Sequence, residues 1–164
     1  MIPDAVVDRV EDVSAELLGR WAIRGIALDL DNTIVPWHTA DLRASLQLWV
    51  AEMRRAGMAF CILTNNYGRQ AHAVAKLLEI PIVKGAVKPF PRSFRRALRA
   101  LGTAPRQSMV IGDQLFTDVL GGKLVGMRAV LVRPIGSREF PTTKILRMLE
   151  APIVRRLRRH SPPR

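Results

Sequence analysis

The chain of 164 residues contains a single cysteine, Cys61, which excludes an internal disulfide framework and a cysteine-based zinc cluster. No uninterrupted apolar run comes near the roughly 18 residues that a membrane-spanning helix needs. The first residues, Met1 to Asp4, lack the basic and then apolar layout of a signal peptide. These absences predict a soluble, cytoplasmic protein, and the length is that of one domain.

Aromatic residues are also scarce, at 5% of the chain. The three tryptophans, Trp21, Trp37 and Trp49, are not spaced as a platform on which bases could stack. This spacing makes nucleic acid a less favoured partner. The remaining composition, 48% hydrophobic and 24% charged, is typical of a globular protein.

Acidic residues become rare in the second part of the chain. Residues 1–90 hold ten basic and ten acidic residues, whereas residues 91–164 hold sixteen and four, so the second part carries the whole net charge of +12. Such an uneven field favours an anionic partner, which could be nucleic acid, an anionic bilayer or a phosphorylated substrate. A solvated, arginine-rich surface is the alternative that charge alone leaves open.

Short apolar runs alternate with longer helical patterns along most of the chain. The predicted strands are residues 26–30, 58–63, 81–83, 109–111 and 129–132, and the predicted helices are residues 40–56, 67–79, 90–101 and 114–125. This alternation predicts an α/β fold in three layers, with a central parallel sheet of about five strands and helices on both faces. Residues 1–140 form the predicted domain, with residues 1–25 as a helical lead-in. Residues 141–164 form a basic, helical C-terminal tail.

In an open parallel sheet, ligands bind beyond the carboxyl ends of the strands. The polar residues that follow the predicted strands are therefore the candidates for chemistry: Asp29 and Asp31, then Thr64 and Asn65, then Lys88, and finally Asp113 and Asp118. Asp29 and Asp31 are two residues apart in an extended segment, so their carboxylates leave the same face and repel each other. A hard divalent cation with oxygen ligands, for which Mg²⁺ is the first choice, relieves this repulsion. Because Lys88 can then hold phosphate oxygens, the set predicts phosphoryl transfer.

These residues resemble the motifs of the haloacid dehalogenase-like (HAD) phosphatases. Residues 29–33, with the letters DLDNT, match the DxDxT motif, and Thr64 and Lys88 match the second and third motifs. Residues 112–118, with the letters GDQLFTD, match the fourth motif. Within this superfamily the sequence looks like the YqeG-like group of subfamily IIIA, which is related to phosphatidylglycerophosphate phosphatases.

The resemblance implies a role for each of these residues. Asp29 would be the nucleophile that forms an aspartyl-phosphate, and Asp31 would be the general acid and base. Mg²⁺ would be held by Asp29, the Leu30 carbonyl and Asp113, with Asp31 and Asp118 in the layer around these ligands. The phosphate-binding residues would be Thr64, Asn65 and Lys88. The resemblance also implies the strand order 3-2-1-4-5.

The spacing of the motifs bears on the substrate. Asp31 and Thr64 are separated by room for one helix and one strand, and Thr64 and Lys88 by another such pair, so no large cap domain fits. The open site and the basic tail favour phosphatidylglycerophosphate as substrate, with the protein in peripheral contact with the anionic inner membrane surface. Two alternatives stay open: a HAD phosphatase of a soluble sugar phosphate, nucleotide or nucleic-acid end, and a basic RNA- or ribosome-binding protein with a vestigial site.

Two further features have simpler interpretations. Cys61 lies inside an apolar strand and is expected in the core, and the arginine that a cysteine-dependent phosphatase needs six residues later is replaced by Tyr67. Four arginines share one face of the helix predicted at residues 90–101, where a solvated surface is the ordinary role: Arg92, Arg95, Arg96 and Arg99.

Overall fold

The computed structural model describes residues 2–37 and 39–136 of the chain. Its strands are β1 (Ala5–Val7), β2 (Gly25–Leu28), β3 (Ala59–Leu63), β4 (Ile82–Val83), β5 (Ser108–Gly112) and β6 (Arg128–Val132). Its α-helices are α1 (Ala15–Arg20), α2 (Ala44–Arg55), α3 (Arg69–Leu78), α4 (Pro91–Leu101) and α5 (Leu120–Leu124). Two 3-10 helices, Val10–Asp12 and Pro105–Gln107, and a π-helix, Leu115–Val119, complete the set. The predicted C-terminal tail, residues 141–164, lies outside the described residues.

The six strands form one parallel sheet in the order β1-β6-β5-β2-β3-β4. The predicted α/β class is therefore confirmed, and the five predicted strands stand in the order 3-2-1-4-5. The predicted helical lead-in also contains a strand that was not predicted: Ala5–Val7 pairs with Val130–Val132 and adds a sixth strand at the edge. The lead-in does contain α1, whose N-terminus is capped by the Ser14 side chain accepting the Leu17 N–H.

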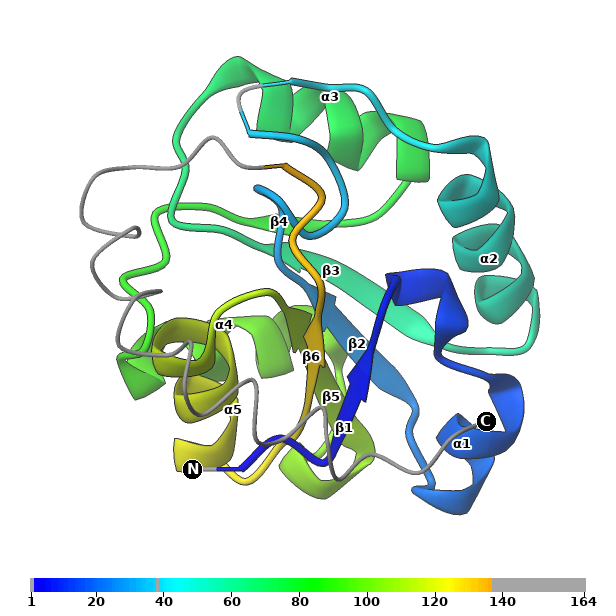
Figure 1. Ribbon diagram of the computed structural model, residues 1–164. Helices are drawn as coiled ribbons and strands as arrows, with labels where there is room; N and C mark the ends of the chain where they lie inside the picture. Colours follow the sequence, from blue (N-terminus) through cyan, green and yellow to red (C-terminus); the bar gives the residue numbers. More distant parts are fainter. Residues whose placement is uncertain (1, 38, 137–164) are drawn as a thin grey trace.

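The helices cover both faces of the sheet, as Figure 1 shows: α1, α2 and α3 lie on one face, and α4 and α5 lie on the other. Alternate residues of each central strand point to opposite layers, because side chains in a strand alternate between the two faces. In β2, Ile26 and Leu28 belong to the core under α2 and α3, whereas Ala27 belongs to the core under α4. Strands that are buried on both faces explain the continuous apolar runs in the sequence.

Helix α4 illustrates how local sequence sets the element boundaries. Pro91 occupies the first helical turn, where a missing N–H costs nothing, and Gly102 ends the helix with a φ of 65°. The buried side of α4, which includes Phe94 and Ala97, packs on the sheet. The helix predicted at residues 114–125 instead begins as the π-helix Leu115–Val119 and continues as α5.

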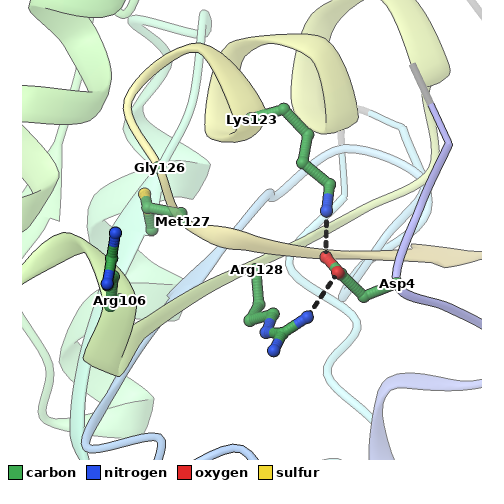
Figure 2. Close-up of a pocket in the computed structure, with 6 residues that line it drawn as sticks. All are labelled: Asp4, Arg106, Lys123, Gly126, Met127 and Arg128. Atoms are coloured by element: carbon green, nitrogen blue, oxygen red, sulfur yellow. Dashed lines mark hydrogen bonds and ion pairs between the residues drawn. The ribbon is translucent and has the colours of Figure 1, made fainter.

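Strand β1 is fixed to the sheet by Asp4, which is drawn with its partners in Figure 2. The Asp4 carboxylate accepts hydrogen bonds from Lys123 Nζ, from Arg128 at 2.9 Å and from the Ala129 N–H at 2.7 Å. Arg128 also lies over the Trp21 ring, 5.2 Å from its centroid. Asp4, Lys123 and Arg128 line a hollow of about 430 Å³ at the amino ends of the strands, together with Arg106, Gly126 and Met127.

No cap domain interrupts the described part of the chain, in agreement with the prediction. The described residues between β2 and β3 form one helix, α2, and those between β3 and β4 form α3. Among the described residues, no helix combines the length and the apolar character needed to cross a membrane.

Candidate active site

The candidate site begins where the order of the sheet reverses. Chain connections run outward from the adjacent strands β2 and β5 in opposite directions, which is the position where open α/β sheets bind ligands. Asp29 directly follows β2 and Asp113 directly follows β5. The Asp29 N–H donates to the Ile111 carbonyl at 2.9 Å, continuing the ladder between the two strands. Strand pairing alone therefore places two residues that are 84 positions apart next to each other.

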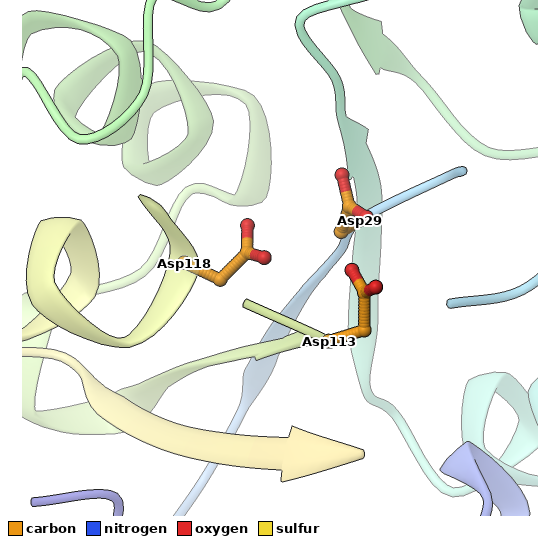
Figure 3. Close-up of side chains that lie close together, drawn as sticks. All are labelled: Asp29, Asp113 and Asp118. Carbon is orange, nitrogen blue, oxygen red and sulfur yellow. The ribbon is translucent and has the colours of Figure 1, made fainter. Parts of the chain in front are cut away.

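Three carboxylates converge at this point, as Figure 3 shows. One oxygen from each of Asp29, Asp113 and Asp118 lies within 4.8 Å of the others, and all three residues are buried. The Thr33 hydroxyl donates to Asp29 Oδ2 at 3.0 Å and lies 3.3 Å from Asp113 Oδ1. The structure thus brings together three of the predicted metal-site residues.

Lys88 provides the positive charge among these carboxylates. Its Nζ lies 2.5 Å from Asp29 Oδ1 and 2.7 Å from Asp118 Oδ1, and it also donates to the Leu63 carbonyl at 3.3 Å. Burial by itself would lower the pKa of Lys88, but the charges of Asp118 and Asp29 outweigh it and raise that pKa. Lys88 is therefore charged across the physiological pH range.

The cluster is rich in buried carboxylates. Three of them gather at one point, and Lys88 contacts two of the three, Asp29 and Asp118. Burial raises the pKa of Asp118 to about 6, and the charge of Asp29 adds to this effect although Lys88 opposes it. A divalent cation would relieve the repulsion among these carboxylates, whose oxygens are the ligands that hard cations prefer. The donor set therefore fits a divalent metal.

Asp31 is held apart from this cluster. It is half-buried, and its Oδ2 accepts a hydrogen bond from Asn66 Nδ2 at 3.0 Å. The Asn66 side chain also accepts the Gly68 N–H at 2.6 Å, which is the turn-capping role expected of it. Asn66 therefore connects the loop after β3 to the Asp31 side chain.

Thr64 and Asn65 lie in the same loop after β3. Thr64 is buried, its hydroxyl accepts the Asn66 N–H at 3.0 Å, and its carbonyl accepts the Ala86 N–H at 3.0 Å. Asn65 Oδ1 accepts the Lys88 N–H at 3.2 Å. The two residues therefore fix the loop that carries Lys88 against the loop after β3.

The Leu30 carbonyl has a different environment from the one expected. It accepts the backbone N–H groups of Thr33, Ile34 and Val35, at 3.4, 3.1 and 3.2 Å. These bonds use its lone pairs inside the turn after β2, which disfavours the predicted role of this carbonyl as a metal ligand. The same turn requires a left-handed residue, and Asn32 has a φ of 62°.

Two contributors to the site lie in the matched motifs but had no role assigned from the sequence. Thr33 is the last residue of the DxDxT match. Gly112 is the first residue of the fourth-motif match, and only the structure shows its role, because a Cβ built on it would overlap the Asp118 carboxyl group. A side chain at position 112 would therefore displace the partner of Lys88.

Cys61 takes no part in the cluster. It is fully buried in β3, and burial raises the pKa of its thiol to about 12. The structure confirms its expected place in the core.

Comparison with known proteins places the chain among phosphatases. Residues 86–138 match the family model described as HAD-hydrolase-like. The chain is 35% identical to the probable phosphatase YqeG of Bacillus subtilis over 158 residues, which cover 96% of this chain and 92% of the relative.

A more distant relative and a solved structure are also similar to this chain. The chain is 26% identical to the chloroplastic/mitochondrial phosphatidylglycerophosphate phosphatase 1 of Arabidopsis thaliana, over 95% of this chain and 48% of that protein. The fold resembles that of the cobalt-bound deoxy-D-mannose-octulosonate 8-phosphate phosphatase of Haemophilus influenzae, with a TM-score of 0.56 and 12% identity, covering 68% of this chain and 69% of that one. The second similarity concerns the fold.

Proposed function

Because the chain belongs to the YqeG-like phosphatases of the HAD superfamily, and is thus a phosphoric monoester hydrolase, we propose that it works through an aspartyl-phosphate on Asp29, with Mg²⁺ as cofactor. We propose phosphatidylglycerophosphate as the favoured substrate. The observation that supports the chemistry best is the buried cluster in which Lys88 contacts Asp29 and Asp118 beside Asp113.

In the first step, an Asp29 oxygen attacks phosphorus while the bond to the leaving oxygen breaks. Asp31, held by Asn66, gives its proton to that oxygen, so the product leaves as an alcohol. Lys88 offsets the negative charge that the transferring group adds to the buried cluster. Thr64, Asn65 and the nearby backbone amides would bind the phosphoryl oxygens.

In the second step, water attacks the aspartyl-phosphate and the bond between Asp29 and phosphorus breaks. Asp31, now ionised, takes the proton of this water, which restores the starting state of both carboxyl groups. Asp29 and Asp113 would hold the Mg²⁺, and Asp118 would position Lys88. When bound, Mg²⁺ supplies charge stabilisation to the phosphoryl oxygens.

The substrate proposal rests on separate support. A relative aligned over 95% of this chain is a phosphatidylglycerophosphate phosphatase, and the described residues place no cap over the site. An open site suits a phosphate attached to a large or surface-bound group. The net charge of +12 favours an anionic surface such as a bilayer rich in phosphatidylglycerol.

The test is phosphate release from phosphatidylglycerophosphate in anionic vesicles, with Mg²⁺ or with EDTA, in parallel with a soluble aryl phosphate. Asp29→Asn is expected to abolish release from both, a loss of at least about 10³-fold, since it removes the nucleophile. Asp8→Asn is the matched control, because the Asp8 carboxylate is exposed and pairs with Arg133.

Each outcome separates one part of the proposal. Retained turnover in Asp29→Asn would refute the nucleophile, and turnover in EDTA would refute the metal. Turnover of the aryl phosphate alone would keep the enzyme and favour a soluble sugar phosphate, nucleotide or nucleic-acid end as substrate. Silence on both substrates, with salt-sensitive RNA binding, would favour the RNA- or ribosome-binding alternative.

A further inference from the structure

Three large apolar side chains are exposed beside the candidate site. Tyr67, Val87 and Phe90 are 75%, 59% and 62% exposed, and we call them the apolar rim. Tyr67 belongs to the loop after β3, and Val87 and Phe90 belong to the loop after β4. Single exposed apolar residues are ordinary, but three of them on loops that border one site indicate a binding surface.

The rim is firmly connected to the site. The two loops are joined by the hydrogen bonds from the Ala86 and Lys88 N–H groups to Thr64 and Asn65. The Tyr67 ring lies against Gly85, where a Cβ would collide with it. Tyr67 is therefore held against the loop that carries Val87 and Phe90.

In the sequence, Lys88 lies between two members of the rim, Val87 and Phe90. The Phe90 N–H donates to the Val87 carbonyl at 2.9 Å, which closes a turn around Lys88. Within this turn the Lys88 side chain is buried and contacts Asp29, whereas the Val87 and Phe90 side chains face solvent. A surface that engages Val87 and Phe90 is thus brought next to the residue that binds the phosphate.

The charge around the rim has one sign. Residues 64–100 contain eight lysines and arginines and one acidic residue, Glu79. Glu79 lies at the C-terminal end of α3, where it pairs with Arg54, away from the loops of the rim. Arg69 and Arg92, both exposed, stand at the N-terminal ends of α3 and α4 beside these loops.

We propose that the apolar rim inserts into the boundary between headgroups and acyl chains of an anionic bilayer, and so presents lipid-linked phosphate to Asp29. Exposed apolar side chains flanked by arginines match such a boundary, because the apolar groups enter the acyl region while the cations stay among the anionic headgroups. A soluble, polar substrate gives no reason to expose Val87 and Phe90. This inference rests on the proposed lipid substrate, but its main test does not need turnover.

The main test is cosedimentation of the full chain with vesicles of phosphatidylglycerol and phosphatidylcholine, and with vesicles of phosphatidylcholine alone. The Asp29→Asn protein is used throughout, so that binding is measured without turnover. We expect Val87→Ser combined with Phe90→Ser to weaken binding to the anionic vesicles by about tenfold or more, because two apolar side chains no longer enter the bilayer. Thermal melting shows whether the variant is folded.

The matched control combines Leu77→Ser with Leu124→Ser. These leucines are 57% and 56% exposed, but they lie near the C-terminal ends of α3 and α5, toward the amino ends of the strands and away from the site. Their replacement is expected to change binding by less than about twofold, since neither borders the site. Equal binding of the rim variant and the unmodified protein would overturn the proposal, as would an equal loss in the control.

Two further experiments distinguish the electrostatic contribution to vesicle binding from the apolar contribution, and test the effect of the rim on the rate. Arg92→Gln is expected to weaken binding to the anionic vesicles by about fivefold, and to leave the weak binding to phosphatidylcholine vesicles as it is. In proteins that retain Asp29, the rim variant should lower the rate on vesicle-borne phosphatidylglycerophosphate at least tenfold more than the rate on an aryl phosphate. If the lipid is turned over and the rim and control variants do not differ, the proposed function stands but the proposed membrane insertion of the apolar rim is overturned.

Discussion

At the carboxyl end of the sheet, three buried carboxylates meet one ammonium, whereas at the amino end one carboxylate meets two cations. Both clusters involve a lysine and an aspartate in close contact. They differ in burial, since Lys88 and Asp118 are almost fully buried, whereas the side chains of Lys123 and Arg128 are 33% and 46% exposed. Buried carboxylates that lie close together repel one another unless a cation joins them, whereas the exposed cations at the amino end are solvated by water.

The same comparison distinguishes a cluster that holds a strand in place from a cluster that is suited to catalysis. The Asp4 cluster holds β1 against β6, and its charges are satisfied by side chains and by the Ala129 N–H. The Asp29 cluster gathers three buried carboxylates around one lysine, a donor set that fits a divalent cation. The number of buried carboxylates, rather than the type of residue, therefore distinguishes the candidate active site.

The largest effect is expected when the lysine is removed from each cluster in turn. Lys88→Met removes the ammonium that contacts the buried carboxylates of Asp29 and Asp118, and we expect the free energy of unfolding measured in EDTA to fall by about 3–5 kcal/mol. Mg²⁺ should then raise the melting temperature of this variant more than that of the unmodified protein. Lys123→Met is the control, with an expected loss of about 1 kcal/mol, because Arg128 still pairs with Asp4. Equal losses in the two variants would contradict the distinction between the clusters.

A smaller effect is expected from a methyl group placed next to Asp118. Gly112→Ala should lower the free energy of unfolding by about 2 kcal/mol and lower the phosphatase rate, because its Cβ overlaps the carboxyl group that pairs with Lys88. Gly19→Ala in α1 is the control, since no atom lies within 4 Å of the Cβ it would introduce. In a helix this change should stabilise by about 0.5–1 kcal/mol. Denaturant unfolding and aryl phosphate turnover measure both quantities, and full activity in Gly112→Ala would show that Asp118 can move without consequence.

The smallest effect is expected at the amino end of the sheet. The pKa of Asp4 is lowered: burial by itself would raise it, but Lys123, the Ala129 N–H and Arg128 together outweigh burial. Its contribution to the free energy of unfolding is therefore present above the ordinary pKa of 3.8 and is lost as the pH falls through the lower folded value. We expect Asp4→Asn to cost about 1 kcal/mol at pH 7 with little change in turnover. The stabilities of variant and unmodified protein should converge as the pH falls below about 4.

Asp8→Asn serves as the control for this prediction. Asp8 and Arg133 form a pair whose side chains are both more than half exposed, so its loss should cost less than about 0.5 kcal/mol. A pH-independent difference for Asp4→Asn would show that its carboxylate contributes through shape rather than charge.

The central strands and the main site residues could be predicted because their signals are local. A buried strand is a short apolar run, and the polar residues at its carboxyl end, such as Asp29 and Asp113, follow directly in the sequence. Parallel pairing of β2 with β5 then brings these residues together without further information.

The missed features depend on distant partners. Strand β1 has three half-buried residues, and its partner β6 lies more than a hundred residues later, so no short window of sequence indicates it. The hydrogen bond from Asn66 to Asp31 joins two loops, and the fit of Gly112 against Asp118 depends on the path of the π-helix. Each of these is a relation between segments, whereas sequence patterns describe one segment at a time.

The pairing of β1 with β6 also has a consequence for the order in which the chain folds. Asp4 and Ala129 are 125 positions apart, so closing this contact carries a large loop-closure entropy, and it forms only after β6 exists. During synthesis, at about 5–20 residues per second, the first strand leaves the ribosome on the order of ten seconds before its partner. Throughout that interval the segment Ala5–Val7 has no partner strand to pair with. Any factor that binds short apolar segments of nascent chains therefore competes with β6 for this segment.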